Sequence, residues 1–390
     1  MLLLEVDGKA LFARAGIPVP RAVLDDGGAP VTLPGESGWI AKAQVPVGGR
    51  GKAGGVLPVP TPEALPAVRR ALLGKRIKGF DTREILIEQA CAGDEHYLAL
   101  ILDAAAAGAR LIYSPFGGVE IESREAGSGG YNAVVPLEAD ALAAAVHAMA
   151  DTAPASHRAA ILRAGQSLAS LFLDKQLLLA EINPLFALAG GEVVAGDAKV
   201  VIDMNTLPRQ PELVALLDTR RHCYPDGWRK YSEDFDFVEI DADGQIGLVT
   251  TGAGLSMMLI DELVGQGLAP YNFCDVRTGQ MRGSPARLLR IFDWLQAAPH
   301  VRVLLVNVFA GITDLGEFAQ LLVDALRARP EWNVPVVARL VGNGETEARR
   351  IIGANGDLGI RCEPDLQRAI ACVDALLRNE AAAREKNDVV

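Results

Sequence analysis

The sequence predicts an α/β protein with two differently organised parts. In residues 1–230, segments with strand and helix patterns alternate irregularly, as in an α+β domain. In residues 231–390, apolar segments of strand length repeatedly end in glycine and lead into amphipathic helices. That repeat is typical of an open parallel sheet with helices on both faces. A chain of 390 residues is also long enough for two or three domains.

The elements of the first part follow from hydrophobic periodicity and turn residues. We expect a helix over "VDGKALFARAG" that ends at Gly16, and a second over "TPEALPAVRRALL", which Thr61 can cap and Pro62 can begin. The stretch "LLLAEINPLFALAGGEVVAGDAKVVID" reads as a hairpin around Gly190 and Gly191. Further strands are expected at "WIAKAQV", "EILIEQA", "YLALILDA" and "GARLIYSPFGGVEIE", and further helices at "EADALAAAVHAMA" and "SHRAAILRAGQSLASLFLDK".

The second part begins after a polar, irregular stretch from Thr219 to Phe237, which we expect to be a linker. The strands expected beyond it are "QIGLVTTGAG", "VRVLLVNVFAG" and "VPVVARLVGNG", each followed by a helix. Ligands of open parallel sheets gather at the carboxyl ends of the strands. The glycines lie at those ends, so a small-molecule site is expected there.

Composition excludes several classes of function. The net charge is −11 and no block of like charge is present, which disfavours a nucleic-acid surface. Apolar runs are too short for a membrane span or a signal segment, so we expect a cytoplasmic protein. The five cysteines form no C-x-x-C and fit free thiols, and the scattered histidines predict no zinc site.

The stretch "KAQVPVGGRGKAGGV" contains G-x-G-x-x-G at Gly49, Gly51 and Gly54. A Rossmann fingerprint is disfavoured, because the glycines run into the extended "VLPVP" and no acid follows at the required spacing. A Walker A loop is disfavoured because Ala53, and not Ser or Thr, follows Lys52. A glycine flap between two antiparallel strands fits better, since its backbone can approach phosphates while Lys42, Arg50 and Lys52 supply charge. A solvated surface turn without a ligand is the remaining alternative.

The expected hairpin supplies a metal-site hypothesis. Asn183 and Asp197 lie symmetrically about residue 190, so a hairpin with an odd-numbered loop places them opposite each other, with Glu181 on the same face. Amide and carboxylate oxygens suit Mg²⁺. The alternative is that they are ordinary polar residues on a wetted face, and a register shift of one residue would remove the site.

Taken together, these motifs resemble the β subunit of succinate–CoA ligase. The resemblance rests on "LEVDGKALFARAGIPVP", "KAQVPVGGRGKAGG", "GGVEIE", "EINPL", "GDAK", "RQPEL", "GAGLSM", "VLLVNVFAGI" and "VPVVARLVGN", and spans roughly residues 4–380. It implies an ATP-grasp domain followed by a flavodoxin-like CoA-ligase domain. It also implies Mg²⁺, ATP or GTP, CoA, a small organic acid, and a partner α subunit that carries a phosphorylated histidine and the CoA site, in an αβ or α₂β₂ assembly.

The resemblance further assigns roles to residues of this chain. It implies that Lys42 and the backbone of Gly49, Arg50 and Gly51 contact nucleotide phosphates. The other implied roles are adenine binding for Glu88, ribose binding for Glu95, Mg²⁺ ligation for Asn183 and Asp197, orientation of the phosphohistidine for Glu181, and acid binding for Thr251, Gly311, Ile312 and Thr313. By themselves, Glu88 and Glu95 could equally be solvated acids at strand ends.

The second part departs from the family pattern where the acid is expected. Thr251 replaces the usual Asn, Ala310 begins a loop that lacks the usual Arg, and Val341 and Gly344 replace Glu and Asn. Pro46 stands where His is common. Malate or another short acid is therefore an alternative to succinate, because Arg is the usual fork for a carboxylate. A regulatory nucleotide-binding subunit without turnover, and an ATP-grasp ligase that joins a carboxylate to an amine, are alternatives of other classes.

Overall fold

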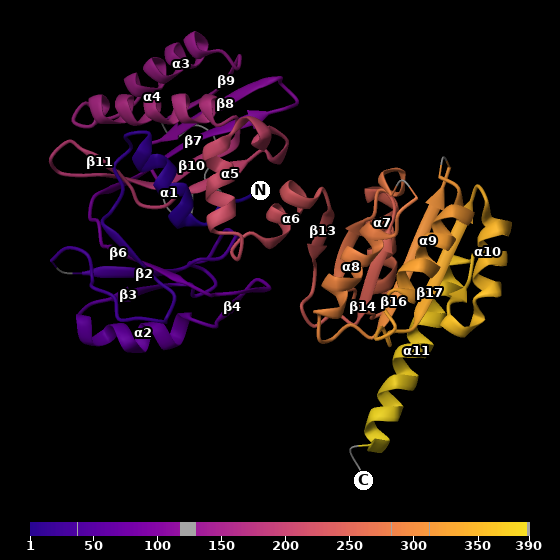
Figure 1. Cartoon of the computed structure of the whole chain (residues 1–390). Coiled ribbons are helices and arrows are strands. Elements are labelled where there is room, and N and C mark those ends of the chain that lie inside the picture. Colours follow the sequence, from indigo (N-terminus) through magenta and orange to yellow (C-terminus); the bar gives the residue numbers. More distant parts are fainter. Residues whose placement is uncertain (37, 118–129, 282, 312, 388–390) are drawn as a thin grey trace. The chain divides into compact units, whose positions relative to one another are not determined.

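A computed structural model describes residues 1–36, 38–117, 130–281, 283–311 and 313–387 of the chain. It divides into two compact units, Met1–Val214 and Ala215–Val390 (Figure 1). The first unit contains antiparallel sheets and the second a mostly parallel sheet. The predicted mixed α/β class is therefore confirmed.

A four-stranded sheet and a helix form the part of the first unit that carries the glycine loop. Its strand order is β1-β6-β2-β3, and all neighbouring strands are antiparallel. Leu65, Val68 and Leu72 recur at helical spacing on α2 and pack against buried Trp39, Ile85 and Ile87 of the sheet. The elements are α1 (Glu5–Arg14), β1 (Ala22–Asp25), β2 (Trp39–Ala43), β3 (Val56–Val59), α2 (Leu65–Leu72), β4 (Arg76–Ile77), β5 (Phe80–Asp81) and β6 (Ile85–Gln89).

A six-stranded sheet completes the first unit. Its order is β11-β10-β7-β8-β9, and β12 also pairs with β10. Helices α3 and α4 pack on one face of it (Figure 1). In β10, buried Ala180 and Ile182 alternate with half-buried Glu181 and Asn183, so the polar residues occupy the other face. The elements are β7 (Asp94–Asp103), β8 (Gly108–Ser114), β9 (Tyr131–Val135), α3 (Ala139–Asp151), α4 (Arg158–Asp174), β10 (Leu177–Ala187), β11 (Val193–Ala195) and β12 (Lys199–Ile202), followed by α5 (Pro211–Thr219).

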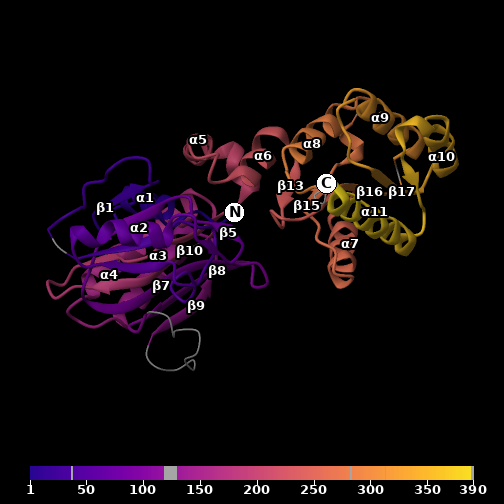
Figure 2. The same ribbon diagram turned by 90° about the horizontal axis from the view of Figure 1, so that it is seen from below.

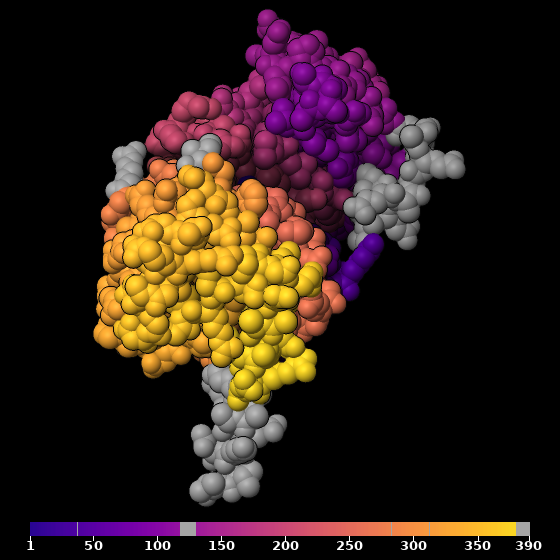
Figure 3. Space-filling model, turned by 90° about the vertical axis from the view of Figure 1, so that its right-hand side faces the viewer, coloured from indigo at the N-terminus to yellow at the C-terminus, as the bar shows by residue number. Residues whose placement is uncertain are grey.

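The second unit has a six-stranded sheet of order β13-β15-β14-β16-β17-β18, antiparallel only between β13 and β15. Helices α8 and α9 cover one face, and α7 and α11 the other (Figure 2). The space-filling view shows the close-packed side chains of this unit in orange and yellow (Figure 3). The elements are α6 (Pro225–Glu233), β13 (Asp236–Glu239), β14 (Ile246–Thr250), α7 (Ala253–Gly265), β15 (Asn272–Asp275), α8 (Ala286–Gln296), β16 (Val303–Ala310), α9 (Leu315–Arg327), β17 (Val336–Gly342), α10 (Glu345–Ala354), β18 (Arg361–Cys362) and α11 (Leu366–Asn387).

Two local predictions are wrong. The stretch expected to be a linker contains α6 and the start of β13. The stretch is polar in composition, but α6 is held to the unit by cation–π contacts. The Arg229 guanidinium lies 5.2 Å from the ring centroids of both Phe237 and Trp294. Thr61 precedes a 3₁₀ turn, Pro62–Ala64, but its side chain caps no backbone amide of that turn.

None of the helices among the described residues combines the length and the hydrophobicity needed to cross a lipid bilayer.

Candidate nucleotide and metal site

The glycine loop joins β2 to β3 as predicted. These strands pair antiparallel, with Lys42 opposite Val56, and the Ala43 amide donates to the Gly55 carbonyl at 2.8 Å. Gly49 and Gly54 adopt φ values of 72° and 68°, in the left-handed region that residues with a Cβ avoid. The backbone path of the loop therefore requires glycine at these two positions.

The loop uses some of its amides internally and leaves others available. Ala53, Gly54 and Gly55 donate to carbonyls within the loop. The amides of Gly49, Arg50 and Gly51 donate to no acceptor among the described residues. Consecutive free amides are the groups that bind phosphate oxygens in glycine loops.

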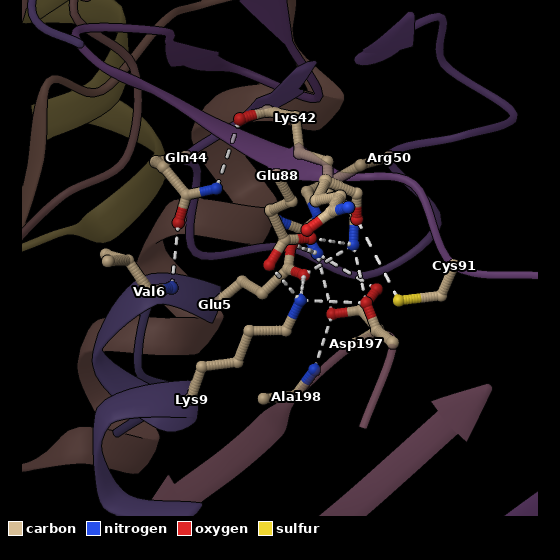
Figure 4. Close-up of polar contacts among 12 residues, drawn as sticks. Glu5, Val6, Lys9, Lys42, Gln44, Arg50, Glu88, Cys91, Asp197 and Ala198 are labelled. Atoms are coloured by element: carbon tan, nitrogen blue, oxygen red, sulfur yellow. Dashed lines mark hydrogen bonds and ion pairs between the residues drawn. The ribbon is translucent and has the colours of Figure 1, made fainter. Parts of the chain in front are cut away.

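A cluster of six charged side chains, which we call the charge cluster, lies beside the loop (Figure 4). Lys42 from β2 contacts Glu5 of α1 and Glu88 of β6, each at 2.7 Å. Lys9, one turn after Glu5, contacts Glu5 at 2.8 Å and also Glu88. The ammonium groups of Lys9 and Lys42 both donate to the Gly196 carbonyl, at 2.8 and 2.6 Å.

Arg50 extends the charge cluster from the glycine loop to the hairpin. Its guanidinium lies 2.7 Å from Glu5 and donates to both Asp197 oxygens, at 3.0 and 3.1 Å. Lys9, Lys42 and Arg50 thus balance the charges of Glu5, Glu88 and Asp197. The glycine loop, a helix and two sheets converge at this point although residues 5 and 197 are far apart in the sequence.

The balance of charge has consequences for ionisation. Burial opposes the charged form of Glu5, but Lys42, Lys9 and Arg50 together hold its pKa well below the ordinary value. Burial likewise opposes the charged forms of Lys42 and Arg50, and the neighbouring carboxylates outweigh it, so the pKa of each is raised. Glu5, Lys42 and Arg50 are therefore charged at neutral pH.

Glu5 and Lys9 are functional candidates that sequence reasoning missed. Both are buried, and the first-turn amide of Val6 donates at 3.0 Å to the Gln44 side chain, which fixes the start of α1 against β2. A signal was available in the sequence: Glu5 and Lys9 occupy i and i+4 on the stripe that continues to buried Phe12. Charged residues at core spacing indicate a buried ion pair.

The hairpin has the register on which the metal hypothesis depends. Leu185 pairs with Ala195 and Glu181 with Lys199, so Asn183 lies across from Asp197, which occupies the break between β11 and β12. A three-residue loop closes the hairpin, because the Leu188 amide donates to the Glu192 carbonyl. Carboxylate and amide oxygens from facing strands are a suitable donor set for Mg²⁺.

Among the other predicted residues of the first unit, Glu181 and Glu95 lie outside the charge cluster, whereas Glu88 belongs to it. Glu181 accepts from the Tyr97 hydroxyl at 3.2 Å and lies 3.9 Å from Lys199. Glu95 is exposed on β7, opposite Phe186. Glu88 is buried and ion-paired, so its interpretation as a solvated acid at a strand end is wrong.

In the second unit the predicted acid-site residues lie at the carboxyl ends of β14 and β16. The Thr251 hydroxyl accepts from the Phe309 amide at 3.3 Å, and Gly311 directly follows β16. The Thr313 hydroxyl lies 2.7 Å from that of Thr278, a residue that sequence reasoning missed. Ile312 lies outside the described residues.

Arg277, which precedes Thr278, forms ion pairs with Asp234 and Asp236. This end of the sheet therefore carries the hydroxyls of Thr251, Thr278 and Thr313, and Arg277 there already has carboxylate partners.

Comparison with known proteins agrees with the two-unit architecture. Residues 2–187 match the family model described as an ATP-grasp domain, and residues 249–369 match the one described as CoA-ligase. Among solved structures, an ATP citrate lyase from Methanothrix soehngenii superposes with a TM-score of 0.64 over 97% of this chain and 99% of that one. At 17% identity, this likeness concerns the fold alone.

Curated relatives are similar over almost the whole chain. The β subunit of an ADP-forming succinate–CoA ligase from Roseiflexus sp. is 35% identical over 90% of this chain and 93% of its own length. The corresponding subunit from Desulfurococcus amylolyticus is 32% identical over 97% and 99%. With this extent of identity, and both domains in the same order, the chain belongs to the family of succinate–CoA ligase β subunits.

Proposed function

We propose that this chain is the nucleotide-binding β subunit of an acid–CoA ligase that cleaves a nucleoside triphosphate to the diphosphate and phosphate. The observation that carries the proposal is the convergence of Lys42, Arg50 and Asp197 from three separate elements, beside a loop with three available amides. Positioning and charge neutralisation are the main tasks of a protein in phosphoryl transfer. The charge cluster supplies the charges for both tasks.

Nucleotide binding would exchange partners within the charge cluster. In the structure, Lys42 and Arg50 are neutralised by Glu5, Glu88 and Asp197. Triphosphate oxygens compete for the same two cations, since Arg and Lys form strong charge-assisted bonds to phosphate. Arg50 would then release Asp197. That carboxylate becomes available when the phosphates arrive.

The hairpin would hold the divalent ion that accompanies the nucleotide. Asn183 and Asp197 face each other, and both carry the oxygen donors that Mg²⁺ prefers. When bound, Mg²⁺ neutralises phosphate charge and orients the phosphate oxygens. The ammonium groups of Lys9 and Lys42 bind the Gly196 carbonyl, and so hold the backbone beside Asp197 in place.

A histidine on a partner α subunit would carry the phosphoryl group. The relatives are named β subunits, which implies such a partner. In this chain His96 and His157 are buried and bonded to Tyr113 and the Leu188 carbonyl, so neither is placed to act as the carrier. Glu181, held by Tyr97, would orient the incoming imidazole.

The chemistry then balances in three steps. The terminal phosphoryl group moves from the triphosphate to the histidine nitrogen, and from there to the carboxylate of the acid. The sulfur of CoA attacks the acyl phosphate, forms the thioester and releases phosphate. Succinate is the acid we propose first, because the curated relatives are succinate–CoA ligases.

A hydroxylated acid such as malate is the second candidate, and a specific observation favours it. Thr251, Thr278 and Thr313 place three hydroxyls at neighbouring strand ends, and Arg277 there is already neutralised by Asp234 and Asp236. Hydroxyl groups discriminate a substrate hydroxyl well, because each can both donate and accept.

The test is co-expression with an α-like subunit, followed by incubation with terminally labelled ATP or GTP. We expect label on the α-subunit histidine, and CoA-thioester formation with succinate or malate from an acid panel. Nucleotide binding without any transfer of label would instead support a regulatory subunit. Amide formation with an amine acceptor would support the carboxylate–amine ligase.

A further inference from the structure

We propose that Lys75 and Lys78, on the β4–β5 hairpin, are positioning residues that hold the glycine loop in its phosphate-binding geometry. The Lys75 ammonium donates to the Gly54 carbonyl and the Lys78 ammonium to the Gly48 carbonyl, both at 2.7 Å. The inference rests on the proposed function, because it concerns the same nucleotide site. It assigns a role to two residues that lie outside the charge cluster.

The two lysine contacts lie on either side of the loop segment that would bind phosphate. Gly48 and Gly54 flank Gly49, Arg50 and Gly51, whose amides donate to no acceptor within the described ranges. A carbonyl turned toward a triphosphate would repel it. A lysine on each flanking carbonyl engages that oxygen outside the phosphate site and adds a positive charge at the edge of the loop. The loop is therefore fixed at both ends while its middle stays available.

The hairpin that carries the lysines is itself anchored under the loop. Ile77, between Lys75 and Lys78, is buried and packs with Ala43, Val45 and Ala53 of the loop and its supporting strand. The fit at Gly55 is so close that an added Cβ would lie 2.7 Å from the Ile77 side chain. Packing of Ile77 thus holds the backbone of the hairpin in register with the loop, so that half-buried Lys75 and exposed Lys78 both reach it.

The turn of the hairpin is a second observation that concerns Lys78. Lys78 and Gly79 form its two-residue connection, with φ values of 48° and 90°. Such turns favour Asn-Gly, because a residue with a long side chain is strained at positive φ. Lysine at this position costs local stability, and the contact with Gly48 gives a reason for it.

The experiment compares Lys75→Met, Lys78→Met and the double substitution in the full-length chain, by calorimetric titration with Mg²⁺ and ADP or ATP. Each single change should weaken nucleotide binding about tenfold, the size expected when one charge-assisted hydrogen bond is lost, and the double change should weaken it further. Lys75→Arg and Lys78→Arg should restore most of the affinity. Arg70→Met is the matched control, because Arg70 is an exposed cation on the neighbouring helix α2.

Lys78→Asn separates positioning from folding. Asn suits the turn, so thermal stability should equal or exceed that of the wild type, while its short side chain cannot reach Gly48 and nucleotide affinity should fall. In the assembled enzyme, the KM for nucleotide should rise while kcat and the KM values for acid and CoA stay within about twofold.

Wild-type affinity in the double variant would overturn the inference, as would an equal loss in Arg70→Met. A wild-type chain that binds no nucleotide would overturn the proposed function itself. The two failures are thus distinguishable.

Discussion

The charge cluster of the first unit and the strand ends of the second unit differ in the kind of polar group that they present, and under the proposed function they would recognise different ligands. The cluster places three basic and three acidic side chains in a largely buried site, where each has a partner of the opposite type. The strand ends present hydroxyls from Thr251, Thr278 and Thr313, and their arginine is already paired. A highly charged phosphate needs strong preset charges, whereas choice among similar acids depends on a few neutral hydrogen bonds.

The difference follows from the free-energy cost of burying a charge. Cations without partners could not stay buried, because the cost of removing a charge from water is several kcal/mol. Glu5, Glu88 and Asp197 offset the cost of burying Lys42 and Arg50, and under the proposed function phosphate oxygens would take over that task. The strand ends need no group of opposite charge, because hydroxyls can hydrogen-bond to one another, as those of Thr278 and Thr313 do.

The largest effect should come from Asp197→Ala. Phosphorylation of the partner by Mg-nucleotide should fall by about 10²–10³-fold or more, because the proposed ion loses its carboxylate ligand. Assembly and folding should persist, since the Asp197 side chain is 36% exposed. Transfer of labelled phosphate measures the effect. Glu192→Ala, an exposed acid on the same hairpin, is the control, and normal transfer by Asp197→Ala would refute the metal assignment.

Glu5→Gln should have its main effect on stability. It leaves three buried cations with one carboxylate fewer, a change that costs about 3–5 kcal/mol at buried ion pairs. Chemical denaturation measures the loss. The exposed Glu138→Gln should change stability by less than about 0.5 kcal/mol. Equal stability of Glu5→Gln and wild type would mean that the cluster is not a closed set of ion pairs.

Thr278→Val tests the role of the strand-end hydroxyls in the second unit. The ratio of kcat/KM for malate over succinate should change by about tenfold, because the variant leaves the Thr313 hydroxyl without its partner. Nucleotide KM should not change. Steady-state kinetics with both acids measure the ratio. Ser232→Ala is the control, because the Ser232 hydroxyl donates to the Trp228 carbonyl of its own helix. An unchanged ratio would exclude Thr278 from acid selection.

The smallest expected effect concerns pH. Burial, with a further contribution from the nearby His157, lowers the pKa of His96 below its ordinary value of 6.5, while Asp94 acts in the opposite direction. An unfolded chain therefore binds a proton more readily than the folded one, and stability contributed by neutral His96 is present above pH 6.5 and lost as pH falls through the folded pKa. His96→Gln should lose less unfolding free energy than wild type between about pH 7.5 and 5.5.

Denaturant titrations at several pH values measure this difference. The exposed His147→Gln should follow the wild type. If His96→Gln also follows the wild type, the buried histidine does not contribute to the acid sensitivity of the fold.

Patterns in the sequence were sufficient to predict the local elements and several of their pairings. The spacing of apolar residues distinguishes the strands β2, β10 and β16 from the helices. The symmetric placement of Asn183 and Asp197 about residue 190 predicted the hairpin register that the structure has. These features depend on neighbouring residues and on period, which a linear sequence records. The helix α6 was missed because it packs through Arg229 on the aromatic rings of Phe237 and Trp294. A contact of this kind leaves no hydrophobic period in the sequence.

Which charged side chains meet depends on how distant elements pack. Nothing in the spacing of Glu5, Lys42, Glu88 and Asp197 indicates that they share one site, because each comes from a different element. The same is true of Thr278 with Thr313, and of Lys75 with Gly54. Partners at long range are set by how whole sheets and helices pack, and only then do electrostatics select among the groups that packing has brought within reach.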